Sequence, residues 1–502
     1  MARTDGRIGE RLDGRTPVLV GAGLATQRPD DPRDGLDAVG LMRAALDAAA
    51  ADAGPGGAGL LDRVDEIVVP EGIWATRDPG RDVLDGRSPG ARSTMAAIGV
   101  LQQRCFSRAA TQLARGDAEV VVVVGGEAKW RALRSQITGI EVSETNGGTA
   151  AEVLRPHQDV LPPVEIERGL AAPTHQYAVM ESALRHAAGR SVAAHEAHLA
   201  ELIAGFAAVA ATNPDAWNRS GPPAAEIATA ALVAAPYRKP ACSQWNVDQA
   251  AAFVLTTVER ARAVGVPSER WVFPWAGAES NLMVPLVERA DVAASPAMAA
   301  VGRALADAAG RPLAEVELLE LYSCFPAAVQ IQVAELGLTD AVTAGRPITV
   351  TGGMHYGGGP LNSFTFQALA RMVPMLRAEP ASLAFVSSVS GMLTKFGAGL
   401  WSATPPPAGW QDLDVTAAAE SATATRALDV DHVGSASVVG HTVGFLGGAA
   451  HELVAVLDTP SGGRTIARSS DPDLLERGLA DDLVGSSAGV AGERLLSVSR
   501  PG

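Results

Sequence analysis

The chain has 502 residues, of which 47% are hydrophobic, and its formal net charge is −15. This length and composition predict a globular protein with more than one domain and exclude a disordered chain. The negative charge argues against general binding to nucleic acid or to anionic membranes, because both need basic patches.

The cysteine pattern and the first 15 residues indicate the cellular compartment in which the protein is expected to lie. Three cysteines, widely spaced and without a CxxC pair, exclude a disulfide framework and a cysteine-based zinc site. Residues 1–15 are polar and of mixed charge, without the apolar core of a signal peptide. No stretch offers the roughly 20 uncharged apolar residues of a membrane helix. We therefore expect a cytoplasmic protein without a membrane partner.

The N-terminal part alternates strands and helices. Residues 17–23 and 64–70 predict buried strands, and residues 37–52 between them predict an amphipathic helix. A helix is predicted over 101–115, and the all-valine run 120–124 predicts a strand that is covered on both faces. Strands that alternate with helices favour mainly parallel sheets with helices outside.

Residues 128–239 differ in character from what precedes them. They contain charge clusters, several prolines, five of the nine histidines and an Ala-rich helix predicted near 192–212. His195 and His198 lie three residues apart on that helix, but no third ligand candidate accompanies them. A solvated helix face is the simpler interpretation of this pair, and we expect no metal site. The chain then returns to a predicted strand over 253–257.

A second series of strands and helices begins at Trp271. It has the same order of elements as the first, strand–helix–strand–helix–strand, which indicates a duplicated fold. Ser295 before Pro296 is a typical start of a helix. The predicted elements are a helix over 296–309, a strand over 316–321, a helix over 329–336, a glycine-rich loop over 352–359, a helix over 364–373 and a strand over 383–389.

Beyond the stiff linker Pro405-Pro406-Pro407, residues 408–502 predict a small β domain. Few basic or aromatic residues line it, so we do not expect it to bind nucleic acid. Its predicted elements are strands over 435–445, 452–457, 465–467 and 493–498 and a helix over 472–478.

Two loops carry most of the functional information. Tyr322-Ser323-Cys324-Phe325 follows a strand, and Gly352-Gly353 precedes Gly358-Gly359-Pro360 in a glycine-dense loop. Such glycines let the backbone approach a ligand or adopt positive φ. The simpler alternative is a tight turn between a strand and a helix.

Together these loops resemble the motifs of the thiolase superfamily. The helix that ends at Gly116-Asp117, with its strand to Gly125-Gly126-Glu127, is similar to the segment that carries the thiolase nucleophile. The resemblance implies an α/β, duplicated five-layered α-β-α-β-α fold and an extra OB-like β-barrel, as in the thiolase-like proteins of type 1. The implied parts are 16–127 with 240–270 as the N-terminal half, 128–239 as the loop domain that covers CoA, 271–404 as the C-terminal half and 408–502 as the β domain.

The same resemblance implies that the catalytic side chains of the family are missing. The nucleophile position falls on Gly99, the active-site histidine on Gly359, the residue of the first loop on Tyr322 and the second cysteine on Ser387. Cys105 lies almost two turns further along the helix and points elsewhere. Because a thiolase needs a thiolate and bases that glycine cannot supply, we expect no thiolase reaction.

Three functions remain open at this point. The first is binding of CoA or an acyl-CoA thioester, without a tightly held cofactor, in a role in lipid metabolism. The second is acyl transfer or thioester hydrolysis by His355, Tyr322 or Cys324, although Cys324 is more simply a buried small side chain. The third is a scaffold that docks a partner through its C-terminal domain, with the oligomeric state undecided. The CoA contacts implied by the resemblance are Arg134, Arg238, Gly358 and Ser390.

Overall fold

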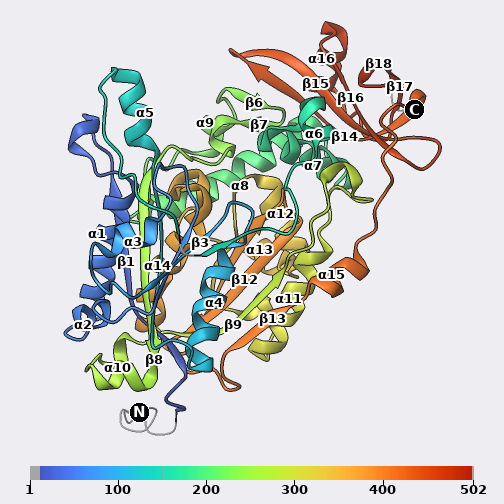
Figure 1. The fold of residues 1–502 in the computed structure, drawn as a ribbon. Helices are drawn as coiled ribbons and strands as arrows, with labels where there is room; N and C mark the ends of the chain where they lie inside the picture. The colour runs from blue at the N-terminus through green and yellow to red at the C-terminus, as the bar shows by residue number, and fades with distance from the viewer. Residues whose placement is uncertain (1–11, 151, 500–502) are drawn as a thin grey trace.

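The computed structural model describes residues 12–150 and 152–499, which form two α/β halves, an inserted loop domain and a C-terminal barrel (Figure 1). Residues 1–11, on which the expectation of no signal peptide largely rests, lie outside the described residues. The predicted α-β-α-β-α arrangement with an extra β-barrel is confirmed.

The first sheet has the strand order β1-β8-β4-β2-β3-β5. Its strands β4, β2, β3 and β5 are parallel, whereas β8 runs antiparallel to both β1 and β4. Ala128 at the end of β4 pairs with Asp248 at the start of β8, so the chain re-enters the sheet where it left it. The bounds are β1 Pro17–Gln27, β2 Glu66–Pro70, β3 Arg92–Ala96, β4 Val120–Ala128, β5 Glu152–Leu154 and β8 Asp248–Thr257.

The second sheet has the order β10-β11-β12-β9-β13 and is also mixed, with β12 antiparallel to both neighbours. The prediction of mainly parallel sheets is confirmed, since all strands of each sheet run in one direction except β8 in the first and β12 in the second. The strands are β9 Phe273–Ser280, β10 Leu318–Glu320, β11 Leu383–Ser390, β12 Lys395–Ser402 and β13 Gln411–Asp414.

Strand β13 changes one predicted boundary. It pairs in parallel with β9, and α15 (Thr416–Ala422) then packs on α11 (Pro296–Ala309) through the buried Ala419. The sequence places both segments in a C-terminal domain that starts at 408. In the structure they belong to the second α/β half, because β9 supplies the hydrogen-bonding edge that β13 needs.

Two helices, α4 (Gln102–Arg115) and α14 (Phe364–Ala378), lie between the sheets. On α4, the Phe106 ring lies 5.1 Å from the Phe253 ring of β8 and 5.4 Å from the Trp401 ring of β12, in edge-to-face geometry. One side chain thus joins both sheets. Burial of such an aromatic side chain stabilises the fold by about 1.5–3 kcal/mol. The outer layers are α1 (Ala38–Asp52) on the first sheet, and α11 and α12 (Pro326–Glu335) on the second.

The loop domain is built around α7 (Pro173–Ala187) and α8 (Val192–Thr212). By length and composition alone, helix α8 is long and apolar enough to cross a membrane, since an 18-residue window within it has a mean hydropathy of 1.2. One third of the residues in this window are buried inside the structure. Buried helices of globular proteins pass the same test.

The other short α-helices and strands of the chain are α2 Gly57–Leu61, α3 Pro79–Leu84, α5 Lys129–Thr138, α6 Pro163–Glu165, α9 Ala224–Ile227, α10 Val258–Ala263, α13 Thr339–Thr343, β6 Leu232–Ala234 and β7 Tyr237–Arg238.

The C-terminal strands close into a five-stranded barrel in the order β14-β15-β16-β18-β17, and β17 pairs with β14 again. Strand β14 also pairs with β6, so the barrel shares a continuous sheet with the loop domain. The sequence does not predict β17. The bounds are β14 Val433–Leu446, β15 Ala449–Asp458, β16 Arg464–Ser469, α16 Pro472–Ala480, β17 Ser487–Ala491 and β18 Arg494–Val498.

Candidate functional site

Gly99 lies just before α4, at the predicted nucleophile position, with φ +101°. A Cβ atom built there would lie 3.0 Å from Pro156 Cγ and 3.5 Å from Val160 Cγ1. A side chain at this residue is therefore strained by the backbone and crowded by the loop that follows β5. The site presents backbone where the resemblance places a reactive sulfur.

The carbonyl oxygen of Gly99 is held by two side chains that sequence reasoning did not bring together. Ser390 Oγ donates to it at 3.2 Å and Lys395 Nζ donates at 2.5 Å. Lys395 is buried, and burial lowers its pKa despite the opposing charge of Glu279. A lysine at the start of an apolar strand is the only sequence signal for this contact. Ser390 was predicted as a CoA contact, and here it positions the Gly99 turn.

Glu279 on β9 is a second buried charge behind the Gly99 turn. Burial raises its pKa to about 7, although Arg104 acts in the opposite direction. Its Oε1 atom has no hydrogen-bond partner among the described residues. Burial and the charge of Glu279 raise the pKa of Cys105 to about 12, so this thiol is not a replacement nucleophile.

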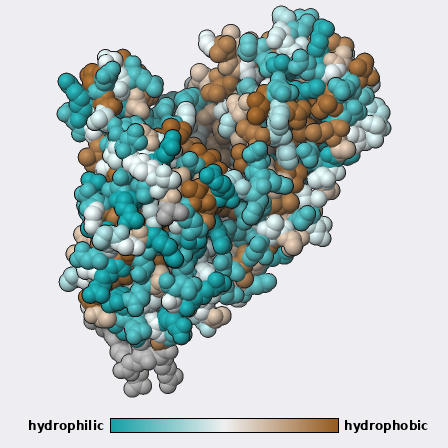
Figure 2. All heavy atoms as spheres, in the orientation of Figure 1, coloured by the Kyte–Doolittle hydropathy of each residue, from teal (hydrophilic) through white to brown (hydrophobic). Residues whose placement is uncertain are grey.

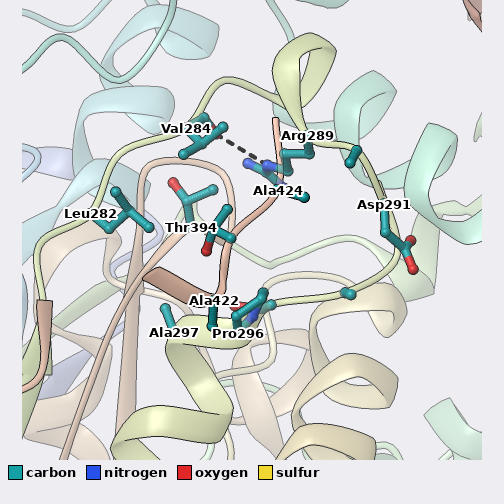
Figure 3. Close-up of a pocket in the computed structure, with 13 residues that line it drawn as sticks. Leu282, Val284, Arg289, Asp291, Pro296, Ala297, Thr394, Ala422 and Ala424 are labelled. Atoms are coloured by element: carbon teal, nitrogen blue, oxygen red, sulfur yellow. Dashed lines mark hydrogen bonds between the residues drawn. The ribbon is translucent and has the colours of Figure 1, made fainter. Parts of the chain in front are cut away.

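The turn after β11 is fixed from the other side by Arg289. Its Nε donates to Val284 O at 3.1 Å (Figure 3), and its Nη2 donates to Met392 O at 2.6 Å. Met392 and Leu393 have φ of 49° and 81°, which strains residues other than glycine. Arg289 lines a cavity of about 150 Å³ beside this turn. Its buried guanidinium stabilises the turn that leads to Lys395.

Glu320 at the end of β10 organises the entry to the glycine-rich loop. Its carboxylate accepts hydrogen bonds from Thr349 Oγ1 at 2.8 Å, Val350 N at 2.8 Å, Thr351 N at 3.0 Å and Thr351 Oγ1 at 2.9 Å. Burial raises the pKa of Glu320 to about 7 despite these donors. The loop is thus held by one buried carboxyl group.

Gly359, to which the resemblance assigns the active-site histidine, and its neighbour Gly358 are both packed closely against other side chains. A Cβ at Gly358 would lie 2.0 Å from Gln249 Oε1, and one at Gly359 would lie 2.5 Å from Ser243 Oγ and 3.2 Å from Met354 Cε. Histidine at Gly359 therefore requires its neighbours to move. Gly358 is predicted as a CoA contact, and in this structure it packs against the Gln249 side chain.

Tyr322 and Ser387 lie side by side and share a hydrogen bond. Ser387 Oγ accepts from Tyr322 N–H at 2.8 Å and donates to Gln332 Oε1 at 2.7 Å. The Tyr322 ring packs edge-on against Phe364 at 5.7 Å, and burial raises its pKa. The Ser387 hydroxyl thus serves to position the first loop, and it donates to the Gln332 side-chain amide, which is not a base.

His355 and Cys324 are both buried and neither is activated. The His355 ring lies 5.4 Å from Phe206 of α8, and burial lowers its pKa to about 4, so it is neutral near pH 7. Both of its ring nitrogens lack a hydrogen-bond partner among the described residues. Burial raises the pKa of Cys324 to about 12, which fits an unreactive small side chain.

The two arginines predicted to meet CoA phosphates are engaged with the protein. Arg134 on α5 donates from Nε and Nη2 to Asp30 O at 3.1 and 3.0 Å. Arg238 on β7 donates to Ala230 O at 2.7 Å and to Glu196 at 3.3 Å. They lie on separate elements of the molecule, and their role toward CoA stays a prediction.

Figure 2 shows a cleft between the α5 projection and the barrel.

The expectation for the histidine pair of α8 is wrong in one respect. His195 is fully buried, and its Nε2 lies 2.8 Å from Glu181 Oε1. Glu181 also accepts from Tyr237 Oη at 2.8 Å and Gln330 Nε2 at 2.7 Å, because α7, β7 and α12 close over this face of α8. Residues 12–150 and 152–499 contain no group of three His, Cys, Asp or Glu residues that could hold a metal ion.

Comparison with known proteins gives structural matches only. No family model matches the sequence, and no curated protein matches it. A monomeric SCP2-thiolase-like protein type 1 from Mycobacterium smegmatis matches with a TM-score of 0.80 and 26% identity, covering 97% of this chain and 100% of that one. An Ltp2–ChsH2(DUF35) aldolase matches with a TM-score of 0.57 and 20% identity, covering 78% of this chain and 98% of that chain.

A third match is human mitochondrial 3-ketoacyl-CoA thiolase in complex with CoA, with a TM-score of 0.55 and 14% identity over 77% of this chain and 98% of that chain. The last two likenesses show the fold alone. The first extends through the barrel as well as the α/β core. The chain thus has the thiolase fold and is similar over nearly its whole length to an SCP2-thiolase-like protein type 1.

Proposed function

We propose that the chain binds CoA or an acyl-CoA thioester and does not catalyse the thiolase reaction. The observation that carries the proposal is Gly99, whose positive φ and covering loop leave backbone at the nucleophile position. The thiolase fold, and a human relative of that fold in complex with CoA, support a CoA ligand. No tightly bound cofactor is needed for this role.

The missing groups set the expected size of the catalytic loss. Gly99 offers no thiolate, Gly359 offers no imidazole, and Ser387 is hydrogen-bonded to Gln332. Each general acid or base contributes about 10²–10⁴-fold to a rate, and a covalent intermediate needs an activated nucleophile. Loss of several such groups together removes the reaction.

CoA binding is tested by isothermal titration of the full chain with CoA. We expect saturable binding, and we expect Arg134→Ala with Arg238→Ala to weaken it by at least about tenfold, since two ion pairs to phosphates contribute about 1.4 kcal/mol or more. Arg494→Ala, an exposed arginine on the barrel, is the matched control and leaves affinity unchanged. Absence of any CoA binding contradicts the proposed function. If CoA binds with equal affinity to all variants, the CoA site stands but Arg134 and Arg238 are not part of it.

A second candidate function is acyl transfer or thioester hydrolysis that uses His355, Tyr322 or Cys324. One observation favours it, namely that both His355 nitrogens are without a partner among the described residues. We expect any acyl-CoA hydrolysis above the buffer rate to fall in His355→Ala and to persist in Cys324→Ala, whose thiol has a raised pKa. Free CoA released from acetyl-CoA is the measurement, and equal rates in the wild type and both variants contradict this candidate.

A scaffold that docks a partner through its C-terminal domain is the third candidate function, and we propose a cytoplasmic location and a role in lipid metabolism for the chain. A structural relative is described as a complex of Ltp2 with ChsH2(DUF35). A truncation that tests docking has to be made after α15, since a cut at Pro407 also removes β13 from the second core sheet.

A further inference from the structure

A cavity of about 200 Å³ lies between the loop domain and the C-terminal barrel. It shares no lining residue with the thiolase-like loops described above. Helices α7 and α8 and the end of β6 form one side, and β14 and α16 of the barrel form the other. The barrel therefore creates a space that the α/β core alone does not have.

Hydrogen bonds between the two sides hold the walls of this cavity in place. Ala234 of β6 pairs with Gly444 of β14, and Ala235 N–H donates to Val443 O at 2.9 Å. On the other wall, His441 N–H donates to Ser182 Oγ of α7 at 2.8 Å. A site with such backbone connections is formed before a ligand arrives, which lowers the entropy cost of binding.

Arg185 of α7 brings a buried cation to the cavity. Its side chain is almost fully buried, with a relative exposure of 4% for the residue. Its Nη2 donates to Asp482 Oδ1 at 3.0 Å, while its Nε has no partner among the described residues. The Arg185 Nε–H is therefore a donor beside the cavity that is free to bind an acceptor.

His441 of β14 brings a second unpaired nitrogen to the same space. The residue is 2% exposed, and its Nδ1 has no hydrogen-bond partner in the described part of the chain. Burial, together with the charge of Arg185, lowers its pKa to about 4, although the backbone of Gly478 and the charge of Asp482 act in the opposite direction, and the ring is therefore neutral near pH 7. The two side chains come from different domains and line one cavity.

The other residues that line the cavity determine the polarity and the size of the ligand that fits it. Val192, Leu232, Pro236 and Leu479 make much of the lining apolar. The carboxylate of Glu196 also lines the cavity but is paired with Arg238 at 3.3 Å, whereas Arg185 is paired with Asp482 and keeps its Nε as a donor without a partner among the described residues. An apolar cavity of about 150 Å³ is known to hold benzene, so this one fits roughly six to nine non-hydrogen atoms.

We propose that this cavity binds a small monocarboxylic acid, with its carboxylate on Arg185 and His441 and its carbon chain against the apolar walls. Arginine is suited to a carboxylate because its planar guanidinium matches the two oxygens. A ligand there contacts the loop domain and the barrel together and stabilises their contact. The inference is independent of CoA binding, which concerns other loops.

Isothermal titration of the full chain with hexanoate tests the charge requirement, and hexanamide serves as the neutral control of the same size. We expect hexanoate to bind and hexanamide to bind at least tenfold more weakly. Equal affinity for the two compounds, or no hexanoate binding at millimolar concentration, overturns the proposal.

Two variants locate the site. Arg185→Gln removes the cation, and Leu232→Trp fills the cavity while leaving every polar group in place. We expect each to weaken hexanoate binding at least tenfold and to leave CoA affinity unchanged. Hexanoate binding that is unaffected by Leu232→Trp overturns the assignment to this cavity. If Arg185→Gln does not fold because it loses Asp482, Leu232→Trp decides alone.

Discussion

Replacement of Glu320 by alanine is expected to lower the free energy of unfolding by at least about 4 kcal/mol. The four donors on Thr349, Val350 and Thr351 that this carboxylate accepts are buried beneath the glycine-rich loop. Each buried donor left without an acceptor costs about 1–3 kcal/mol, and alanine also leaves a cavity that water enters only partly.

Urea unfolding followed by circular dichroism measures this loss. Glu269→Ala is the matched control, because Glu269 is an exposed glutamate in a short turn. We expect the control to change the unfolding free energy by less than about 0.5 kcal/mol. Similar unfolding free energies for Glu320→Ala and the control contradict the role assigned to Glu320.

The second large effect is a pH dependence that belongs to Glu279. Its pKa is about 7 in the folded protein against 4.5 for an ordinary glutamate. A raised carboxyl pKa contributes stability that is fully present below pH 4.5 and is lost as the pH rises through about 7. The difference between a pKa of about 7 in the folded protein and 4.5 in the unfolded chain corresponds to about 3 kcal/mol of unfolding free energy.

Glu279→Gln removes this titration, since glutamine cannot ionise. We expect the unfolding free energy of the variant, relative to the wild type, to rise by about 3 kcal/mol between pH 4.5 and pH 8. The other buried groups with shifted pKa values titrate in both proteins, so their contributions to the unfolding free energy cancel in the difference; these groups are Glu127, Glu320, His355 and His441. The control Glu269→Gln is expected to follow the wild type at every pH. A variant curve parallel to the wild type contradicts the burial effect at Glu279.

Elements with a strong local pattern are predictable from the sequence. The valine run of β4 and the helix α4 are found because continuous apolar or helical periodicity extends over many residues. Strand β13 is missed because Gln411-Asp412-Leu413-Asp414 is short and polar, and only its pairing with β9 makes it a strand. His195 is misread because α7, β7 and α12 cover the helix face that its spacing alone leaves exposed.

The residues of the candidate site also fall into two groups, those that are predictable from the sequence and those that are not. Positions such as Gly99 and Gly359 follow from motif spacing, since each lies at a fixed distance from a glycine pattern. Lys395 and Glu279 do not, because each lies in an apolar strand and they meet only through the register in which Phe396 pairs with Ser280. That register is a property of the folded sheet and leaves no local trace in the sequence.

Acetyl-CoA formation from acetoacetyl-CoA and CoA, measured by chromatography with the full chain, tests the central claim most directly. The account predicts formation at the rate of the buffer control, because Gly99 and Gly359 supply neither thiolate nor base. Acetyl-CoA formation at ordinary thiolase rates, on the order of 1–10³ per second, would contradict it.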